Sequence, residues 1–313
     1  MQGVFSRDSA RRAEFSAEFG FPQASSLDAL IEDPRIDAIL VLTPPSARVE
    51  IVQACANAGK HVLMEKPIER TTAVAHAIVD VCEKAGVKLA IVFQHRFRGA
   101  ARTLKEILAR RSLGEICAVQ VVVPWWRPQA YYDEPGRGTY SRDGGGVLIT
   151  QAIHTLDLML SLAGPVSEVQ AIAGTTRLHR MESEDFVAGG LKFANGALGS
   201  LVATTAAFPG AAEHIVLDCE RGSARLAGDT LTVQHHDGAI DQYGEEMGTG
   251  GGADPMAFPH DWHRAVIADF AEAVVLNRPP AISGREGLHV HLFIDALIQS
   301  AGENRVVPVM QVT

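Results

Sequence analysis

Short apolar runs alternate with capped helical segments across residues 3–93, and this alternation limits the fold more than any other feature of the sequence. The run IDAILVLT at 36–43 reads as a strand that is buried on both faces. Helical segments with serine or threonine caps and glycine stops separate it from further strand-like runs at 61–64 and 87–93. Strands and helices that alternate with short turns predict a doubly wound parallel sheet.

A different pattern begins after Phe93. We expect helices over 99–111, 147–162, 259–276 and 283–300, a polar loop over 129–143 and a glycine-rich loop over 244–257. Strand-like runs follow one another at hairpin spacing, at 116–126, 166–175, 185–193, 197–206, 215–219, 223–226, 231–234 and 306–309. The chain therefore predicts an α/β domain over 1–94, followed over 95–313 by an α+β domain whose larger, mostly antiparallel sheet is open on one face, with helices on the other.

Composition excludes several classes of partner. The chain has 313 residues and a net charge of −9, which argues against nucleic acid or an anionic membrane as the main partner. Its four cysteines are scattered without metal or redox spacing, so we expect a reduced, cytoplasmic protein with no metal site. No apolar run reaches the length of a membrane span.

The stretch HVLMEKPI at 61–68 places charge at the end of a buried strand. Its apolar part stops at Glu65, Lys66 and Pro67, and open α/β sheets bind their ligands at such carboxyl ends. A lysine that is partly desolvated there can transfer protons. Thr43 and Pro44 end the preceding strand and should lie at the same edge, which would suit the nicotinamide end of a dinucleotide. The alternative is an ordinary turn with solvated charges.

The stretch GGGVLITQAIHTLD at 144–157 predicts a helix with one polar stripe. Thr150, His154 and Asp157 fall at i, i+4 and i+7, with Gln151 beside them. Three polar groups on one face favour a site that faces a cavity. A hydrogen-bonded histidine in the core is the alternative.

Aromatic side chains and an arginine gather before the polar loop, at Trp125, Trp126, Arg127, Tyr131 and Tyr132. Such a group can line a cleft for a ring-shaped, hydroxylated substrate. It can equally form a subunit interface. The sequence does not separate these two interpretations.

Taken together, these motifs resemble the glucose–fructose oxidoreductase/inositol dehydrogenase/MocA family over essentially the whole chain. The resemblance is carried by TPP at 43–45, AGKHVLMEKP at 58–67, GGGVLITQAIHTLD at 144–157 and a helix–Pro-Pro–Ser-Gly segment at 262–284. It implies a Rossmann domain joined to a larger open-faced domain. It also implies an NAD(P)-dependent oxidoreductase that moves a hydride between the cofactor and a hydroxyl-bearing carbon of a sugar, polyol or cyclic diol. Members are usually dimers or tetramers, so we expect a homo-oligomer formed through the open sheet.

The resemblance also implies roles for individual residues. The catalytic pair would be Lys66 and His154. Lys66 would contact the reacting hydroxyl, and its peptide bond to Pro67 would be cis. His154 would transfer a proton or orient the substrate. Substrate contacts would come from Arg96, Trp126, Arg127, Thr150, Gln151 and Asp157. Cofactor contacts would come from Ser6, Arg7, Thr43, Pro44, Glu65, Lys66 and Pro67. Ser6 and Arg7 suit a ribose 2′-phosphate better than a 2′-hydroxyl, so NADP is favoured over NAD.

Three positions depart from the family pattern. Thr150 stands where the family usually has Asp or Asn, and Arg48 stands where it often has His. The strand and G-x-G-x-x-G turn that open a Rossmann domain do not precede residue 3, so on the family pattern about 30 residues are missing. The missing strand would be central, and the sheet would then have a gap, close up or recruit another segment.

These departures keep other functions open. One alternative is a non-catalytic binding or regulatory protein, or a cofactor-deficient truncated form, on the same fold. Another is an elimination-type glycosidase that keeps NAD bound.

Overall fold

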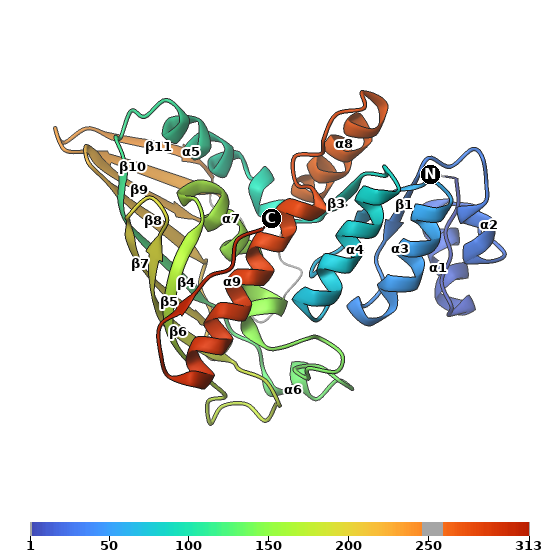
Figure 1. The fold of residues 1–313 in the computed structure, drawn as a ribbon, viewed down its shortest axis with the longest axis horizontal. Helices are drawn as coiled ribbons and strands as arrows, with labels where there is room; N and C mark the ends of the chain where they lie inside the picture. The colour runs from blue at the N-terminus through green and yellow to red at the C-terminus, as the bar shows by residue number, and fades with distance from the viewer. Residues whose placement is uncertain (1, 246–258, 313) are drawn as a thin grey trace.

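Two sheets with their own helices lie side by side in the computed structural model, which describes residues 2–245 and 259–312 (Figure 1). The smaller sheet has three strands in the order β1-β2-β3. The larger has nine strands in the order β11-β10-β9-β8-β4-β7-β6-β5-β12. The expected combination of a small parallel sheet with a larger open sheet is confirmed.

The small sheet is parallel and covered on both faces. Its strands are β1 (Ala38–Val41), β2 (His61–Met64) and β3 (Leu89–Ile91). Leu63 and Ala90 pack with Phe270 of α8 (Asp261–Val275) on one face. Neighbouring residues such as Val62 and Met64 join the main core, where α3 (Arg48–Asn57) and α4 (Thr72–Lys84) lie. Burial on both faces explains why these strands are continuously apolar.

The first residues lie outside this sheet. The strand expected at 3–6 is reduced to a single parallel bridge between Val4 and Gln23, with α1 (Ser9–Phe19) between them and α2 (Leu27–Ile31) after them. Asp8 starts α1 by accepting hydrogen bonds from the amides of Ala10 and Arg11. Among the described residues, β1 pairs only with β2. The expectation that the sheet has a gap, closes up or recruits another segment stays a prediction.

The large sheet is built around β4 (Ile116–Pro124), which runs parallel to β7 (Leu198–Thr204) and antiparallel to β8 (His214–Cys219). The other pairings are antiparallel, as expected. They join β5 (Val166–Gly174), β6 (Phe186–Phe193), β9 (Gly222–Ala227), β10 (Thr230–His235), β11 (Ile240–Gly244) and β12 (Val307–Pro308). Only β11 was not expected, because an edge strand with every residue exposed has no apolar alternation.

Helices cover one face of the large sheet. They are α5 (Gly99–Ala109), α7 (Ile153–Ala163) and α9 (Gly284–Glu303), and α9 also packs on α4 and β3 (Figure 1). The opposite face leaves Ile172 and Leu198 each 64% exposed, as an open face requires. The loop expected over 129–143 contains a short helix, α6 (Gln129–Tyr132). The glycine-rich loop expected over 244–257 lies outside the described residues except at 244 and 245.

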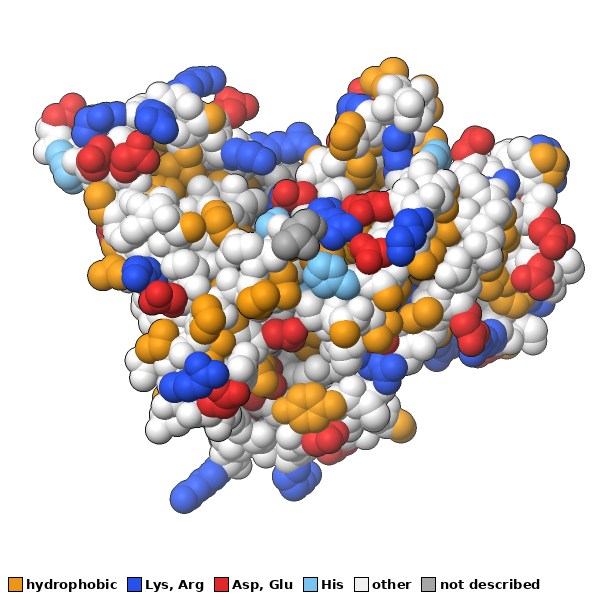
Figure 2. Space-filling view, viewed as in Figure 1, with side chains coloured by type: hydrophobic (Ala, Val, Ile, Leu, Met, Phe, Trp, Pro, Cys, Tyr) orange, Lys and Arg blue, Asp and Glu red, His pale blue; other side chains and the backbone are white. Residues whose placement is uncertain are grey.

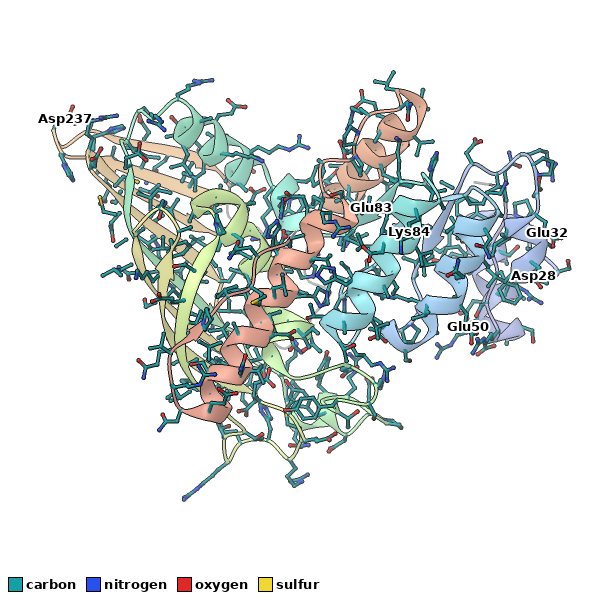
Figure 3. The ribbon with its side chains drawn as sticks, viewed as in Figure 1. Asp28, Glu32, Glu50, Glu83, Lys84 and Asp237 are labelled. Atoms are coloured by element: carbon teal, nitrogen blue, oxygen red, sulfur yellow. The ribbon has the colours of Figure 1, made fainter. Side chains whose placement is uncertain are left out.

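Ion pairs join the two parts where α9 meets α4. Arg285 of α9 pairs with Asp80 and Glu83 of α4, and Figure 3 labels Glu83 at the end of α4 beside α9. Figure 2 shows basic and acidic side chains mixed over this junction. Within residues 2–245 and 259–312, no helix is long and apolar enough to cross a membrane.

Candidate active site

Lys66 lies where the two parts of the molecule meet. β2 brings it to the carboxyl end of the small sheet, and the Lys66–Pro67 peptide is cis, as expected. Its Nζ donates a hydrogen bond of 2.5 Å to the carbonyl oxygen of Thr150. Burial lowers the pKa of Lys66 to about 8, although the charge of Glu65 acts in the opposite direction. The two motifs that the sequence singled out are therefore in contact.

Arg48 holds the two strand ends together. The Arg48 side chain is buried, and its Nε donates to the carbonyl oxygen of Thr43 at 2.9 Å. Its Nη1 donates to the carbonyl oxygens of Glu65 and Pro67. The expectation that 43–45 and 65–67 share one edge is confirmed. The sequence marked Arg48 only as a departure from the family, because nothing local to residue 48 indicates which carbonyls its side chain will reach.

Glycines allow the helix that carries His154 to start close to the backbone of neighbouring segments. A Cβ on Gly146 would lie 1.8 Å from the carbonyl oxygen of Glu184, and one on Gly144 would lie 2.7 Å from Cα of Arg70. The Glu184 carboxylate accepts hydrogen bonds from the amides of Gly146 and Leu148, at 3.1 and 3.2 Å. It thus caps the helix start. Burial raises the pKa of this carboxyl group.

The helix expected over 147–162 begins with a π turn, η3 (Leu148–Ala152), before α7. A π turn has i→i+5 hydrogen bonds, so side chains spaced for an α-helix no longer share one face. Thr150 donates from its hydroxyl to the carbonyl oxygen of Gly146 at 2.6 Å and offers its own carbonyl to Lys66. The Thr150 hydroxyl thus bonds within its own helix, and the convergence of Thr150, His154 and Asp157 on one site stays a prediction.

Asp157 and Arg96 bind each other. Two hydrogen bonds of 2.7 and 2.6 Å join them, and Arg96 also reaches Glu286 at 3.1 Å. A cavity of about 260 Å³ lies beside this ion pair, lined in part by Leu160, Glu286 and His289. The predicted contact of Arg96 and Asp157 with substrate stays a prediction.

His154 is buried close to Lys66. Its ring packs against the ring of His95 with centroids 5.0 Å apart, and against the edge of Phe93 at 6.0 Å. Its Nδ1 has no hydrogen-bond partner among the described residues. Burial, and then the charge of Lys66, hold the pKa of His154 well below its usual range. His154 is therefore a neutral imidazole at neutral pH, and can accept a hydrogen bond.

The aromatic group divides between the core and the site. Trp125 is buried and donates from Nε1 to Glu213 at 3.0 Å. Arg127 is buried, and Nη1 donates to the carbonyl oxygen of Trp126 at 2.7 Å. Tyr131 is the member that approaches the helix of the site, because its hydroxyl lies 3.4 Å from Nε2 of Gln151. Arg137 donates to this hydroxyl at 2.8 Å, a contact that the sequence did not indicate.

The residues predicted to hold a dinucleotide lie at two places. Thr43 is at the carboxyl end of β1, and its Oγ1 is buried without a hydrogen-bond partner in the described ranges. Ser6 and the exposed Arg7 follow the Val4 bridge, where Arg12 donates to the carbonyl oxygen of Ser6 at 3.3 Å. Within the same ranges, no group of three or more His, Cys, Asp or Glu side chains is arranged to hold a metal ion.

Comparisons with known proteins cover both parts of the chain. Residues 1–93 match the model of an oxidoreductase family with an NAD-binding Rossmann fold, and residues 101–225 match the GFO/IDH/MocA C-terminal domain. The chain is 26% identical to the levoglucosan dehydrogenase of Pseudarthrobacter phenanthrenivorans, over 96% of this chain and 87% of that protein. It is 28% identical to the myo-inositol 2-dehydrogenase of Thermotoga maritima, over 90% of this chain and 83% of that protein.

A solved structure is also similar. It is the WlbA dehydrogenase from Bordetella pertussis in complex with NADH and UDP-GlcNAcA. It superposes with a TM-score of 0.82 and 28% identity, over 99% of this chain and 90% of that chain.

Proposed function

Because the chain belongs to the GFO/IDH/MocA oxidoreductase family, we propose that Lys66 and His154 form the active site of an NAD(P)-dependent dehydrogenase for sugars or polyols. The observation that carries this assignment is the 2.5 Å contact between Lys66 Nζ and the carbonyl oxygen of Thr150. It brings a lysine of the small sheet to the helix that carries His154.

The chemistry needs a proton acceptor beside the hydroxyl. An alcohol carbon that gives up a hydride also loses its hydroxyl proton, so that a carbonyl forms. When bound, the nicotinamide supplies the hydride acceptor. Lys66 takes the proton at Nζ, since burial brings its pKa to about 8. His154, which is held neutral, accepts a hydrogen bond from the hydroxyl and orients it. In the reverse direction Lys66 returns the proton.

The residues present fit two ends of a dinucleotide. The unpartnered Thr43 Oγ1 offers a buried hydrogen bond at the edge where Pro44, Glu65, Lys66 and Pro67 would hold the nicotinamide ribose. Ser6 and Arg7 would hold the adenosine ribose, and the exposed cation of Arg7 favours a 2′-phosphate, hence NADP. No glycine-rich turn for the pyrophosphate lies in the described part of the chain.

A hydroxylated ring suits the groups near Lys66. The relatives are named for levoglucosan and myo-inositol, and one similar structure contains UDP-GlcNAcA. In this chain, Gln151 and the nearby Tyr131 offer hydrogen bonds. Substrate contacts are assigned to Arg96, Trp126, Arg127, Thr150, Gln151 and Asp157.

Fluorescence titration of the full chain with NADPH and NADH tests the function. We expect both to bind, NADPH more tightly, and a screen of sugars, polyols and cyclic diols to find a substrate. If a folded chain, checked by circular dichroism, binds neither nucleotide, the dehydrogenase assignment fails. The alternative of a cofactor-free binding protein would then stand.

The proposal also covers the oligomeric state of the protein and the roles of its two domains. The open face of the large sheet, with exposed Ile172 and Leu198, would pair two copies of the chain in a homodimer or homotetramer. Residues 1–94 would form the cofactor domain, and 95–313 the substrate and oligomerisation domain. All four cysteines are free, which supports a reducing compartment such as the cytoplasm.

A further inference from the structure

A second histidine lies against His154. His95 is in the 3-10 turn η2 (Gln94–Phe97), immediately before Arg96, and its side chain is buried. The two imidazole rings are 5.0 Å apart between centroids and tilted by 33°. His95 was given no role by the sequence, because a histidine among polar neighbours on a turn has no periodic signal.

His95 is held by an arginine that is itself anchored in the large sheet. Arg98 is 1% exposed, and its Nη2 lies 2.6 Å from His95 Nε2. Arg98 Nη1 donates to Glu213 at 2.5 Å and to the carbonyl oxygen of Gly228 at 3.1 Å. Glu213 also accepts from Trp125, so the carboxylate that balances the arginine is fixed in turn. The order of contacts is Trp125, Glu213, Arg98, His95 and then His154.

The contact with Arg98 determines where the proton of His95 lies. A guanidinium group only donates hydrogen bonds, so His95 Nε2 must accept. The ring is then neutral and carries its one proton on Nδ1. His95 Nδ1 and His154 Nδ1 are both buried without a partner among the described residues. Buried ring nitrogens normally have one, so this pair of rings can take a polar group that the described residues do not supply.

The charges around His95 and His154 disfavour protonation of either ring. His95 faces the cation of Arg98, and both rings face the cation of Lys66 and the side chain of His263. His263 faces Glu65 in turn. A proton on either ring would add a third positive charge beside those of Lys66 and Arg98. These two cations would repel it strongly, because the effective dielectric constant in the interior is low.

We propose that His95 is a positioning residue for His154: Arg98 fixes His95 as an Nδ1–H ring that accepts at Nε2, and this ring sets the plane in which His154 meets the substrate hydroxyl. The inference rests on the proposed dehydrogenase function only for the role of His154. The ring arrangement itself stands on the contacts of Arg98 and His95.

Nuclear magnetic resonance of the ¹⁵N-histidine-labelled full chain tests the arrangement without cofactor or substrate. His95→Gln and His154→Gln variants assign the two rings. Between pH 6 and 8 we expect His95 as the neutral Nδ1–H tautomer with an accepting Nε2, and His154 as one neutral tautomer. A cationic His95, or one protonated on Nε2, overturns the proposal.

Two variants then test the link between the rings. In Arg98→Gln we expect the His95 ring to lose its single tautomer and the His154 signals to shift, whereas Arg98→Lys, which keeps a cationic donor, should preserve both. Unchanged His154 signals in both Arg98→Gln and His95→Gln overturn the positioning role. If Arg98→Gln does not fold, His95→Gln alone decides.

The role in catalysis has its own readout. With a substrate found by screening, His95→Gln should lower kcat about 10²-fold with little change in KM, and should alter the pH profile. A purely structural role would lower the folded fraction and leave kcat per folded molecule and the pH profile unchanged. If neither NADH nor NADPH binds while the expected tautomers are found, the dehydrogenase function fails and the ring arrangement stands.

Discussion

Lys66 Nζ and the carbonyl oxygen of Thr150 are 2.5 Å apart, so a lysine from the end of β2 is held by the π turn of a helix that belongs to the other sheet. The contact joins residues that are 84 positions apart in the chain. It places the lysine next to His154, and the following predictions start from this geometry.

Replacement of Lys66 by methionine should slow turnover far more than it weakens nucleotide binding. The loss of the group that takes the hydroxyl proton should lower kcat by about 10²- to 10⁴-fold. Steady-state kinetics and fluorescence titration measure the two effects. The exposed Lys84, labelled in Figure 3, provides the control Lys84→Met, which should behave as wild type. Near-normal turnover of Lys66→Met would remove Lys66 from the mechanism.

Alcohol oxidation should become faster as the pH rises toward 8. Burial lowers the pKa of Lys66 from its ordinary value to about 8, so below that pH Nζ already carries the proton and cannot accept another. We expect kcat/KM for oxidation to rise about tenfold per pH unit below 8 and then level off, and carbonyl reduction to show the opposite trend. Stopped assays from pH 6 to 10 measure the profile. A profile that is flat across pH 8 contradicts this assignment.

Arg48→Met should destabilise the small sheet. The substitution leaves the carbonyl oxygens of Thr43, Glu65 and Pro67 without their donor, at a cost of about 3 kcal/mol in the free energy of unfolding. Urea denaturation measures it. The exposed Arg35, which pairs with the neighbouring Asp33, provides the control Arg35→Met, with a change below about 0.5 kcal/mol. Equal effects of the two substitutions would contradict a bridging role for Arg48.

Gly146→Ala should be poorly tolerated. The new Cβ would meet the Glu184 carbonyl oxygen at 1.8 Å, so the start of the helix that carries His154 must move. We expect a loss of at least about 3 kcal/mol in the free energy of unfolding, or no folded protein. Gly190→Ala is the matched control, since a Cβ there meets nothing within 4 Å. Thermal unfolding of the pair decides, and similar melting temperatures would count against the close approach.

Arg7→Glu should reverse the nucleotide preference. Removing the cation that would pair with a 2′-phosphate, and adding a carboxylate that accepts from a 2′-hydroxyl, should weaken NADPH binding relative to NADH by at least about tenfold. Arg11→Glu on the exposed side of α1 controls for net charge. Calorimetry measures both nucleotides. If Arg11→Glu has the same effect, the preference for NADPH comes from the net charge of this region rather than from a contact with Arg7.

The alternation of apolar runs was enough to predict the small sheet, its parallel direction and the edge that carries Lys66. This information is local, since a strand that is buried on both faces must be apolar throughout and must end in a turn. The expected strands 36–43 and 61–64 correspond to β1 and β2, and the cis Lys66–Pro67 bond is present. The polar edge strand β11 escaped prediction because it buries no side chain.

Only the tertiary structure decided which side chains pair. Asp157 was expected beside His154 on a polar face, but it binds Arg96, which lies 61 positions earlier in the chain. The π turn, whose Thr150 carbonyl accepts from Lys66, is invisible in an apolar pattern with helical spacing. Arg98 binds Glu213, which lies 115 positions later in the chain. Each of these polar groups had several possible partners, and the docking of α7 and η2 against the two sheets selected one. The sequence alone thus determined most of the strands and the position of Lys66 at the end of one of them, whereas packing at the junction determined the hydrogen bonds around it.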